Sequence, residues 1–219
     1  IRFGKPLATS LDLDSSFPIS KPLIDDDVRF VGETLGLNEN QLIPSIHLLA
    51  ASTADRRLEN SQLDAGEGFE SLKQQLQAPF DGFTILEAAG SLHEGLLFGL
   101  SLGQIAEAVD AKVILVHSWK DSCSVEALLA AKEQLRDHLV GVVLNAVTPE
   151  EVSELEENVV PALKAIGIEV FGVMPRSPLL RSVTVGELVR RLDARVICCS
   201  ERLELLVETL SIGAMNVNS

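Results

Sequence analysis

The sequence has few cysteines, a shortage of positive charge and no long apolar run. Its three cysteines include the adjacent pair Cys198 and Cys199 and follow no zinc or disulfide spacing, which indicates a reducing compartment. The formal net charge of −14 argues against non-specific binding to nucleic acid or to an anionic membrane. No run approaches the roughly 18 apolar residues of a membrane span, and no signal-peptide pattern opens the sequence. We therefore expect a cytoplasmic protein, or one of an organelle stroma if a transit peptide precedes residue 1.

The common signatures of hydrolytic, zinc and phosphate sites are also missing. The sequence contains no G-x-S-x-G elbow and no G-x-x-x-x-G-K-[ST] phosphate loop, and its four histidines lack metal-ligand spacing. The Gly4-Lys5-Pro6 segment lacks the first glycine and the Ser or Thr of such a loop. Because the sequence begins with a strand-like Ile1 and not with Met, we expect both ends to be cut.

Three short apolar runs form the centre of the sequence, at residues 83–86, 113–117 and 140–144. Each is too short and too uniformly apolar for a half-exposed strand, so we expect strands buried on both faces. The segments 103–109 and 124–139 between them have the length of helices, which gives a β-α-β-α-β order. This order predicts that the three strands are parallel neighbours or near neighbours in one sheet of a doubly wound, mostly parallel α/β fold.

Helix signals and apolar patches predict further elements around this centre. Three aspartates at residues 25–27 favour a helix start, because acids stabilise the positive end of the helix dipole. Thr148 and Pro149 favour another, with a side-chain cap and a first-turn proline. The other predicted elements are strands at residues 1–3 and 169–174, helices at 69–76 and 148–166, an exposed loop at 9–21 and a polar, partly mobile connection at 52–68.

A change in the sequence pattern near residues 175–178 predicts a domain boundary. A length of 219 residues suits one α/β domain plus part of a second. Past the boundary we expect a short helix from residue 182, a strand at 195–199 and a helix or extended segment at 203–210. A truncated second unit leaves apolar side chains exposed, and such surface tends to bind another chain.

Polar residues just after the predicted strands are the first candidates for a site, because ligands of parallel α/β sheets lie beyond the carboxyl ends of the strands. Glu87 follows a buried run, where a carboxylate suits Mg²⁺ or a water bound to it, or caps a backbone N–H group. Lys5 follows the first strand, where it meets a phosphate or carboxylate, or is simply solvated. Asn145 either reads a base edge or is a turn residue. One of the aspartates at 25–27 is a candidate metal ligand. For at least two of them, the role of an acidic residue in the first turn of a helix is favoured.

Several motifs follow one another in an informative order: GKPL at residues 4–7, Asp27, LEAAG at 86–90, FGLS at 98–101, DAKVILV at 110–116, GVVLNAV at 141–147, GVMP at 172–175, PRSPLLRSVTVGEL at 175–188 and IGAM at 212–215. In this order the sequence resembles dethiobiotin-synthetase-like P-loop proteins. It is most similar to the N-terminal region of phosphotransacetylases and to stand-alone cyanobacterial relatives of that region. The tail resembles the opening of a DRTGG domain. No single motif is specific, so the likeness rests on their order together with the tail.

The resemblance implies a P-loop NTPase-type domain over residues 1–176 and the N-terminal part of a DRTGG-like domain over residues 177–219. Its phosphate loop belongs upstream of residue 1, and the rest of the DRTGG unit and the acetyl-transferring domain are also absent. Acetyl transfer is therefore not implied. Ala88 stands where the synthetases carry glycine, so the loop approaches a phosphate less closely.

The resemblance also assigns roles to four residues. It makes Lys5 the lysine on the phosphate or substrate side, Asp27 and Glu87 the carboxylates on the Mg²⁺ side, and Asn145 the asparagine on the nucleobase side. ATP and Mg²⁺ are the implied cofactors, with weak or no binding in a chain that lacks the phosphate loop. No residue is predicted to be catalytic.

Three functions fit this reading. The favoured one is a nucleotide-sensing regulatory module, because Ala88 and the fusion to a DRTGG-like unit fit regulation better than turnover. The second is an ATP- and Mg²⁺-dependent ligase of the dethiobiotin-synthetase type, and the third is a structural subunit that has lost the nucleotide. We lean against enzymatic activity for this chain alone. The expected partner is a second copy or another protein bound through residues 177–219, without nucleic acid and without a membrane span.

Overall fold

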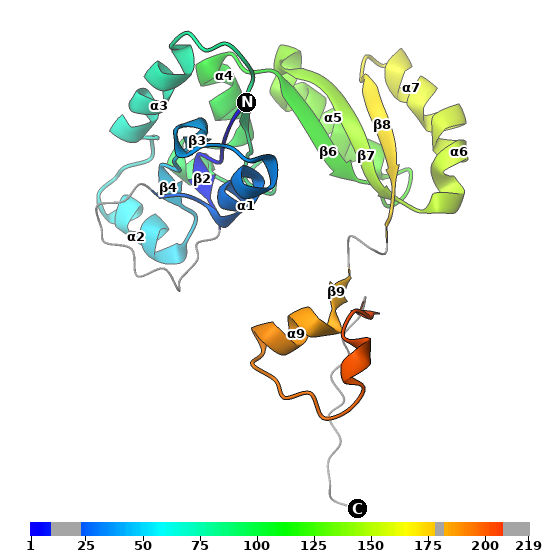
Figure 1. Cartoon of the computed structure of the whole chain (residues 1–219). Helices are drawn as coiled ribbons and strands as arrows, with labels where there is room; N and C mark the ends of the chain where they lie inside the picture. The colour runs from blue at the N-terminus through cyan, green and yellow to red at the C-terminus, as the bar shows by residue number, and fades with distance from the viewer. Residues whose placement is uncertain (10–22, 178–181, 208–219) are drawn as a thin grey trace, which may run out of the picture. The chain divides into compact units, whose positions relative to one another are not determined.

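The structure is a computed structural model that describes residues 1–9, 23–177 and 182–207. Helices and strands are interspersed along the chain, and the sheets are mostly parallel, which confirms the predicted α/β fold class (Figure 1). The strands are β1 (Arg2–Gly4), β2 (Leu7–Ala8), β3 (Leu42–Ile43), β4 (His47–Leu48), β5 (Thr84–Leu86), β6 (Val113–Ser118), β7 (Leu139–Val147), β8 (Val170–Pro175), β9 (Val183–Thr184) and β10 (Leu206–Val207). The α-helices are α1 (Asp26–Leu35), α2 (Ala51–Glu59), α3 (Glu67–Gln77), α4 (Leu102–Val109), α5 (Ser124–Leu135), α6 (Val152–Glu154), α7 (Val160–Ala165) and α9 (Val185–Arg191).

The described residues form two compact units. The first contains Ile1–Leu115 and Val125–Gly141, and the second contains Val116–Ser124 and the described residues from Val142 onward. No helix of the described residues is long and apolar enough to cross a membrane.

In the first unit, β1 is the middle strand of a parallel sheet between β3 and β5. Gly4 is paired with both Ile43 and Leu86, so the carboxyl ends of these three strands lie side by side. A second parallel pair, β2 with β4, follows directly along the chain. The largest core cluster of this unit consists of Leu7, Ile43, Ala65, Phe69, Leu72, Phe98, Leu100 and Ile105.

In the second unit, β7 pairs in parallel with β8, within a sheet of order β6-β7-β8. Helices α6 and α7 contact β8, where Figure 1 shows them in yellow beside the strand. The π-helical turn Leu155–Val159 joins these two helices. Further along the chain, β9 and β10 form their own antiparallel pair beside α9.

The predicted helix start at residues 25–27 is confirmed, whereas the predicted side-chain cap by Thr148 is wrong, because the Thr148 side chain makes no cap hydrogen bond. Asp25 caps α1 by accepting a hydrogen bond from the Asp27 N–H group, and Gly36 ends the helix in the left-handed region at φ 62°. Ser101 and Gln104 form a capping box at the start of α4. The predicted helix at 69–76 is α3, which buries Phe69 and Leu72. These ends were predictable because capping is local chemistry.

Two expectations for the central strands are wrong in part. Strands β5 and β6 are not buried on both faces, since Ile85 is 48% exposed and Val116 is 60% exposed, whereas Val142 and Leu144 of β7 are fully buried. Strands β6 and β7 are neighbours in one sheet, as expected, but β5 does not belong to that sheet, because it pairs with β1. Helix-length crossovers predict parallel strands, but they do not fix which strands become neighbours.

Other differences concern element ends and the tail. The predicted strand at 195–199 is wrong: Ile197 is 87% exposed, and β9 pairs with β10 instead. The polar stretch at 52–68 contains most of α2, and α5 ends at Leu135, followed by a 3₁₀ turn. The predictions that lie outside the described residues are those for residues 10–21, 178–181, 208–210 and 212–215.

Candidate functional site

Lys5 lies at the carboxyl end of β1, where the backbone leaves the parallel sheet. Its side chain is only 5% exposed. Its carbonyl oxygen accepts a hydrogen bond of 2.6 Å from the Ser45 hydroxyl, which lies just after β3. The lysine is therefore a buried ammonium with a fixed backbone and is not a solvated surface group.

Three carboxylates surround the Lys5 ammonium. Its Nζ atom lies 2.5 Å from Asp27 Oδ2, 3.5 Å from Asp25 Oδ1 and 3.6 Å from Glu87 Oε1. We call Lys5, Asp25, Asp27 and Glu87 the Lys5 cluster. Its members come from the end of β1, the start of α1 and the end of β5, so the fold assembles it from segments far apart in the sequence.

The close approach of the strands brings the cluster together. The Glu87 N–H group donates a 2.8 Å hydrogen bond to the Gly4 carbonyl, which continues the β1–β5 pairing by one residue. On the other side of β1, a Cβ atom on Gly4 would lie 2.5 Å from the Cβ atom of Ile43. Glycine is therefore required at this position, because any side chain would push β3 away from the strand that presents Lys5.

The charges of the cluster act on one another. Burial lowers the pKa of Lys5, but the hydrogen bond to Asp27 and the charges of Glu87, Asp25 and Asp27 outweigh it and raise that pKa above its ordinary value. Burial raises the pKa of Glu87, the charges of Asp27 and Asp25 add to the effect, and Lys5 opposes it. Lys5 is therefore a firmly charged cation, while negative charge is in excess among the four groups.

The carboxylates of the Lys5 cluster suit Mg²⁺ only if a bound ligand supplies further oxygen atoms. Asp27 and Glu87 are the partly open members, with side chains 52% and 42% exposed. Their oxygens already converge on one cation, the Lys5 ammonium. Among residues 1–9, 23–177 and 182–207, no group of three or more His, Cys, Asp or Glu side chains is arranged to hold a metal ion. Mg²⁺ commonly binds through one or two carboxylates plus phosphate and water oxygens, and Asp27 and Glu87 fit that pattern.

The structure brings together three of the four predicted site residues, namely Lys5, Asp27 and Glu87. Asn145 belongs to the second unit, where its Oδ1 atom accepts a 2.8 Å hydrogen bond from the N–H group of Ala146, a residue at φ 57°. Its nucleobase-side role stays a prediction. Sequence reasoning gave Asp25 no specific role, although an aspartate directly before a helix is a recognisable N-cap signal.

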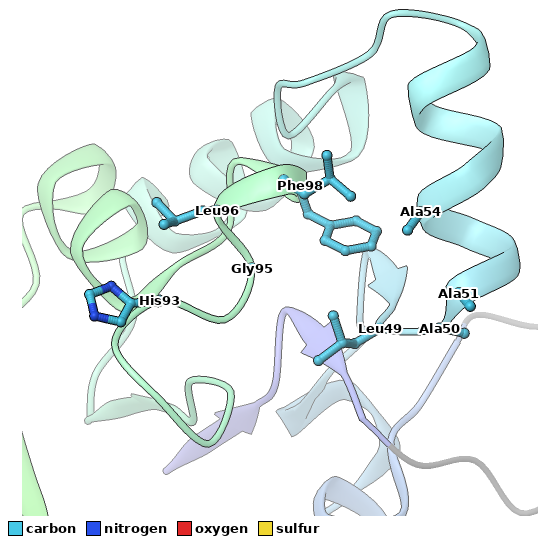
Figure 2. Close-up of a pocket in the computed structure, with 9 residues that line it drawn as sticks. Leu49, Ala50, Ala51, Ala54, His93, Gly95, Leu96 and Phe98 are labelled. Carbon is cyan, nitrogen blue, oxygen red and sulfur yellow. The ribbon is translucent and has the colours of Figure 1, made fainter.

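The first unit also contains an open apolar pocket of about 300 Å³ next to the end of β4. Figure 2 shows the Phe98 ring directed toward Leu49 and Ala54, with His93 beyond Gly95. Lys5 is not among the lining residues, which are Leu49, Ala50, Ala51, Ala54, His93, Gly95, Leu96, Leu97 and Phe98.

Parallel strands with charged side chains gathered at their carboxyl ends are typical of α/β proteins that bind small ligands at that edge. The comparison with protein families gives the class a name. The family model described as an AAA domain matches residues 3–184, which is most of the chain. The chain therefore belongs to this family, a family of P-loop NTPases related to dethiobiotin synthetase.

No solved structure matches the chain. The family match concerns neither phosphotransacetylases nor DRTGG domains, so those parts of the resemblance and the boundary at residue 176 stay predictions.

Proposed function

We propose that this chain is a nucleotide-sensing module that binds ATP with Mg²⁺ at the Lys5 cluster. The observation that carries the proposal is the convergence of Asp27 and Glu87 on one buried ammonium at the ends of β1 and β5. Membership of a P-loop NTPase family supports the nucleotide as the ligand.

Asp27 and Glu87 would hold Mg²⁺, and the metal would link the protein to the phosphates. A bound divalent cation would offset the excess of negative charge in the cluster and leave the Lys5 ammonium available to phosphate oxygens. Lys5 would act as a point charge that needs no fixed approach direction. The Mg²⁺ ion would thus replace the Lys5 ammonium as the cation beside the half-exposed carboxylates of Asp27 and Glu87.

Regulation is favoured over turnover by the residue after Glu87. Ala88 replaces the glycine of the synthetases, and its Cβ atom keeps the backbone further from a phosphate. The tail elements β9, α9 and β10, in which β9 contacts both of the others, would pass the binding signal to a second copy or to another protein.

The second candidate is an ATP- and Mg²⁺-dependent ligase of the dethiobiotin-synthetase type. The observation that favours it is the open apolar pocket beside β4, whose apolar lining suits the carbon chain of an acid substrate. Release of ADP and phosphate that depends on an added aliphatic acid would support this function over sensing alone.

Calorimetry with ATP and Mg²⁺ on the full-length protein tests the proposal. Glu87→Ala should weaken binding at least roughly tenfold, on the order of 1.4 kcal/mol, without changing the far-ultraviolet circular dichroism. Glu107→Ala, on the exposed face of α4, is the matched control and should bind like the wild type. Equal affinities for Glu87→Ala and wild type would remove Glu87 from the site. A wild type that binds no nucleotide would favour the structural subunit instead.

A further inference from the structure

Asp25 differs from the other two carboxylates of the cluster in its burial. Its side chain is 0% exposed, whereas those of Asp27 and Glu87 are 52% and 42% exposed. A carboxylate is removed from water at a high free-energy cost unless its oxygens are hydrogen-bonded or paired with a charge. Asp25 has both kinds of compensation.

Both oxygens of Asp25 are held by backbone groups from different segments. Oδ2 accepts a 2.7 Å hydrogen bond from the Thr9 N–H group, which follows β2, and Oδ1 accepts one of 2.9 Å from the Asp27 N–H group. Oδ1 also lies 3.5 Å from the Lys5 Nζ atom. The Asp25 carboxylate is therefore fixed in direction, and it ties the end of β2, the first turn of α1 and the Lys5 ammonium to one point.

The side chains of Asp27 and Glu87 are about half exposed, so their oxygens can turn toward an incoming cation. If the Asp27 and Glu87 oxygens turn toward a cation, Lys5 loses its nearest partner, Asp27, and keeps the fixed Asp25 carboxylate. A fixed anion at 3.5 Å keeps a buried ammonium in place because the alternative is an isolated charge in a poorly solvated site.

We propose that Asp25 is the positioning residue of the Lys5 cluster: it is the permanent counter-ion that holds Lys5 at the site, while Asp27 and Glu87 are exchangeable partners that pass to the metal ion. The passage of Asp27 and Glu87 to the metal ion rests on the proposed function, whereas the role of Asp25 toward Lys5 does not. The division is between one buried, doubly hydrogen-bonded carboxylate and two half-exposed ones. Asp25 itself is not expected to touch the nucleotide.

Two measurements on the full-length protein test this inference. In the first, protein labelled with ¹³C in lysine reports the side-chain order of Lys5 by NMR relaxation, with the Lys5 signal identified by its loss in Lys5→Met. Asp25→Asn should make the Lys5 side chain mobile, whereas Asp27→Asn and the control Glu33→Gln on the exposed face of α1 should leave it ordered. Adding Mg²⁺ and ATP to the wild type should also leave Lys5 ordered.

The second measurement is a cycle of urea midpoints for Asp25→Asn, Lys5→Met and the double variant. The two changes should be strongly non-additive, with Lys5→Met lowering the midpoint far less when Asp25 is already asparagine. This arm remains informative even if Asp25→Asn is poorly stable, because the double variant removes both charges.

An ordered Lys5 in Asp25→Asn, or additive midpoints, would overturn the role of Asp25. A wild type that binds no Mg²⁺ and ATP, with a mobile Lys5 in Asp25→Asn, would contradict the proposed function and leave Asp25 as the counter-ion of Lys5.

Discussion

The ends of strands in the two units use their polar side chains in different ways. At the end of β1, Lys5 reaches Asp27, a residue 22 positions away, and is buried among carboxylates from the start of α1 and the end of β5. At the end of β7, the side chain of Asn145 bonds to the N–H group of the next residue, Ala146. The Trp119 N–H group bonds to the Asn145 carbonyl, which ties two strand ends together by backbone alone.

This difference separates two kinds of strand-end residue. A side chain that closes its own turn stabilises the local backbone and has less capacity left for a ligand. The position of a charged side chain that is held by several distant partners depends on the fold of the whole unit. A ligand that changes those partners therefore alters contacts between several elements of the unit. By this criterion, the Lys5 cluster is the stronger candidate for a binding site, and Asn145 has a structural role at minimum.

The largest expected effect follows from removing the central cation. Lys5→Met leaves the buried Asp25 carboxylate and its two neighbours without their shared ammonium, and it should lower the free energy of unfolding by about 3 kcal/mol. Urea denaturation followed by circular dichroism measures the change. The control is Lys73→Met, which breaks the surface pair with Glu70 and should change stability by less than about 1 kcal/mol. Similar losses for both variants would mean that the Lys5 cluster is no more than a surface ion pair.

A smaller effect is expected from the glycines in the two sheets. Gly4→Ala places a Cβ atom 2.5 Å from that of Ile43 and should lower the free energy of unfolding by about 2 kcal/mol through overpacking. Gly172→Ala in β8 meets nothing within 4 Å and should be neutral or stabilise by about 0.5 kcal/mol. Equal urea midpoints for the two variants would show that β1 and β3 do not need their close approach.

Local patterns in the sequence predict the elements better than their partners. The cap of α1 by Asp25 and the Ser101 capping box of α4 could be predicted because each involves neighbouring residues. The exposure of Ile85 and Val116 could not, because burial depends on which elements cover a strand. In the tail, the apolar run at 195–199 has a strand-like composition, but β9 takes β10 as its partner.

The candidate site shows the same limit. Glu87, Lys5 and Asp27 could each be marked by position beside a predicted strand or helix, and the family likeness supplied their grouping. The role of Asp25 could not be predicted, because only the folded chain shows that its oxygens receive N–H groups from Thr9 and Asp27 and also face Lys5. The pairing of β5 with β1 likewise required the three-dimensional register.

The smallest effect concerns one histidine in each unit. The pKa of His47 is lowered by burial, partly countered by the hydrogen bond to the Ala65 carbonyl and reinforced by Arg57, and the pKa of His117 is lowered by burial and by Lys120. A lowered pKa means that the folded protein binds the proton more weakly than the unfolded chain. The contribution of each histidine to the free energy of unfolding is therefore present above the ordinary pKa of 6.5 and is lost as the pH falls. The free energy of unfolding should therefore drop less between pH 7 and pH 5 in His47→Gln and His117→Gln than in the wild type. An unchanged drop in either variant would remove that histidine from the pH dependence.

The most direct test of the central claim places a metal–nucleotide complex beside Lys5. Mn²⁺ substitutes for Mg²⁺ and broadens NMR signals of nuclei close to it. In lysine-labelled full-length protein titrated with Mn²⁺ and ATP, the Lys5 signal should broaden at lower Mn²⁺ concentration than the Lys73 signal, and Asp27→Asn combined with Glu87→Gln should abolish the difference. A Lys5 signal that stays sharp while ATP and Mn²⁺ saturate the protein would contradict the assignment of the Lys5 cluster as the nucleotide site.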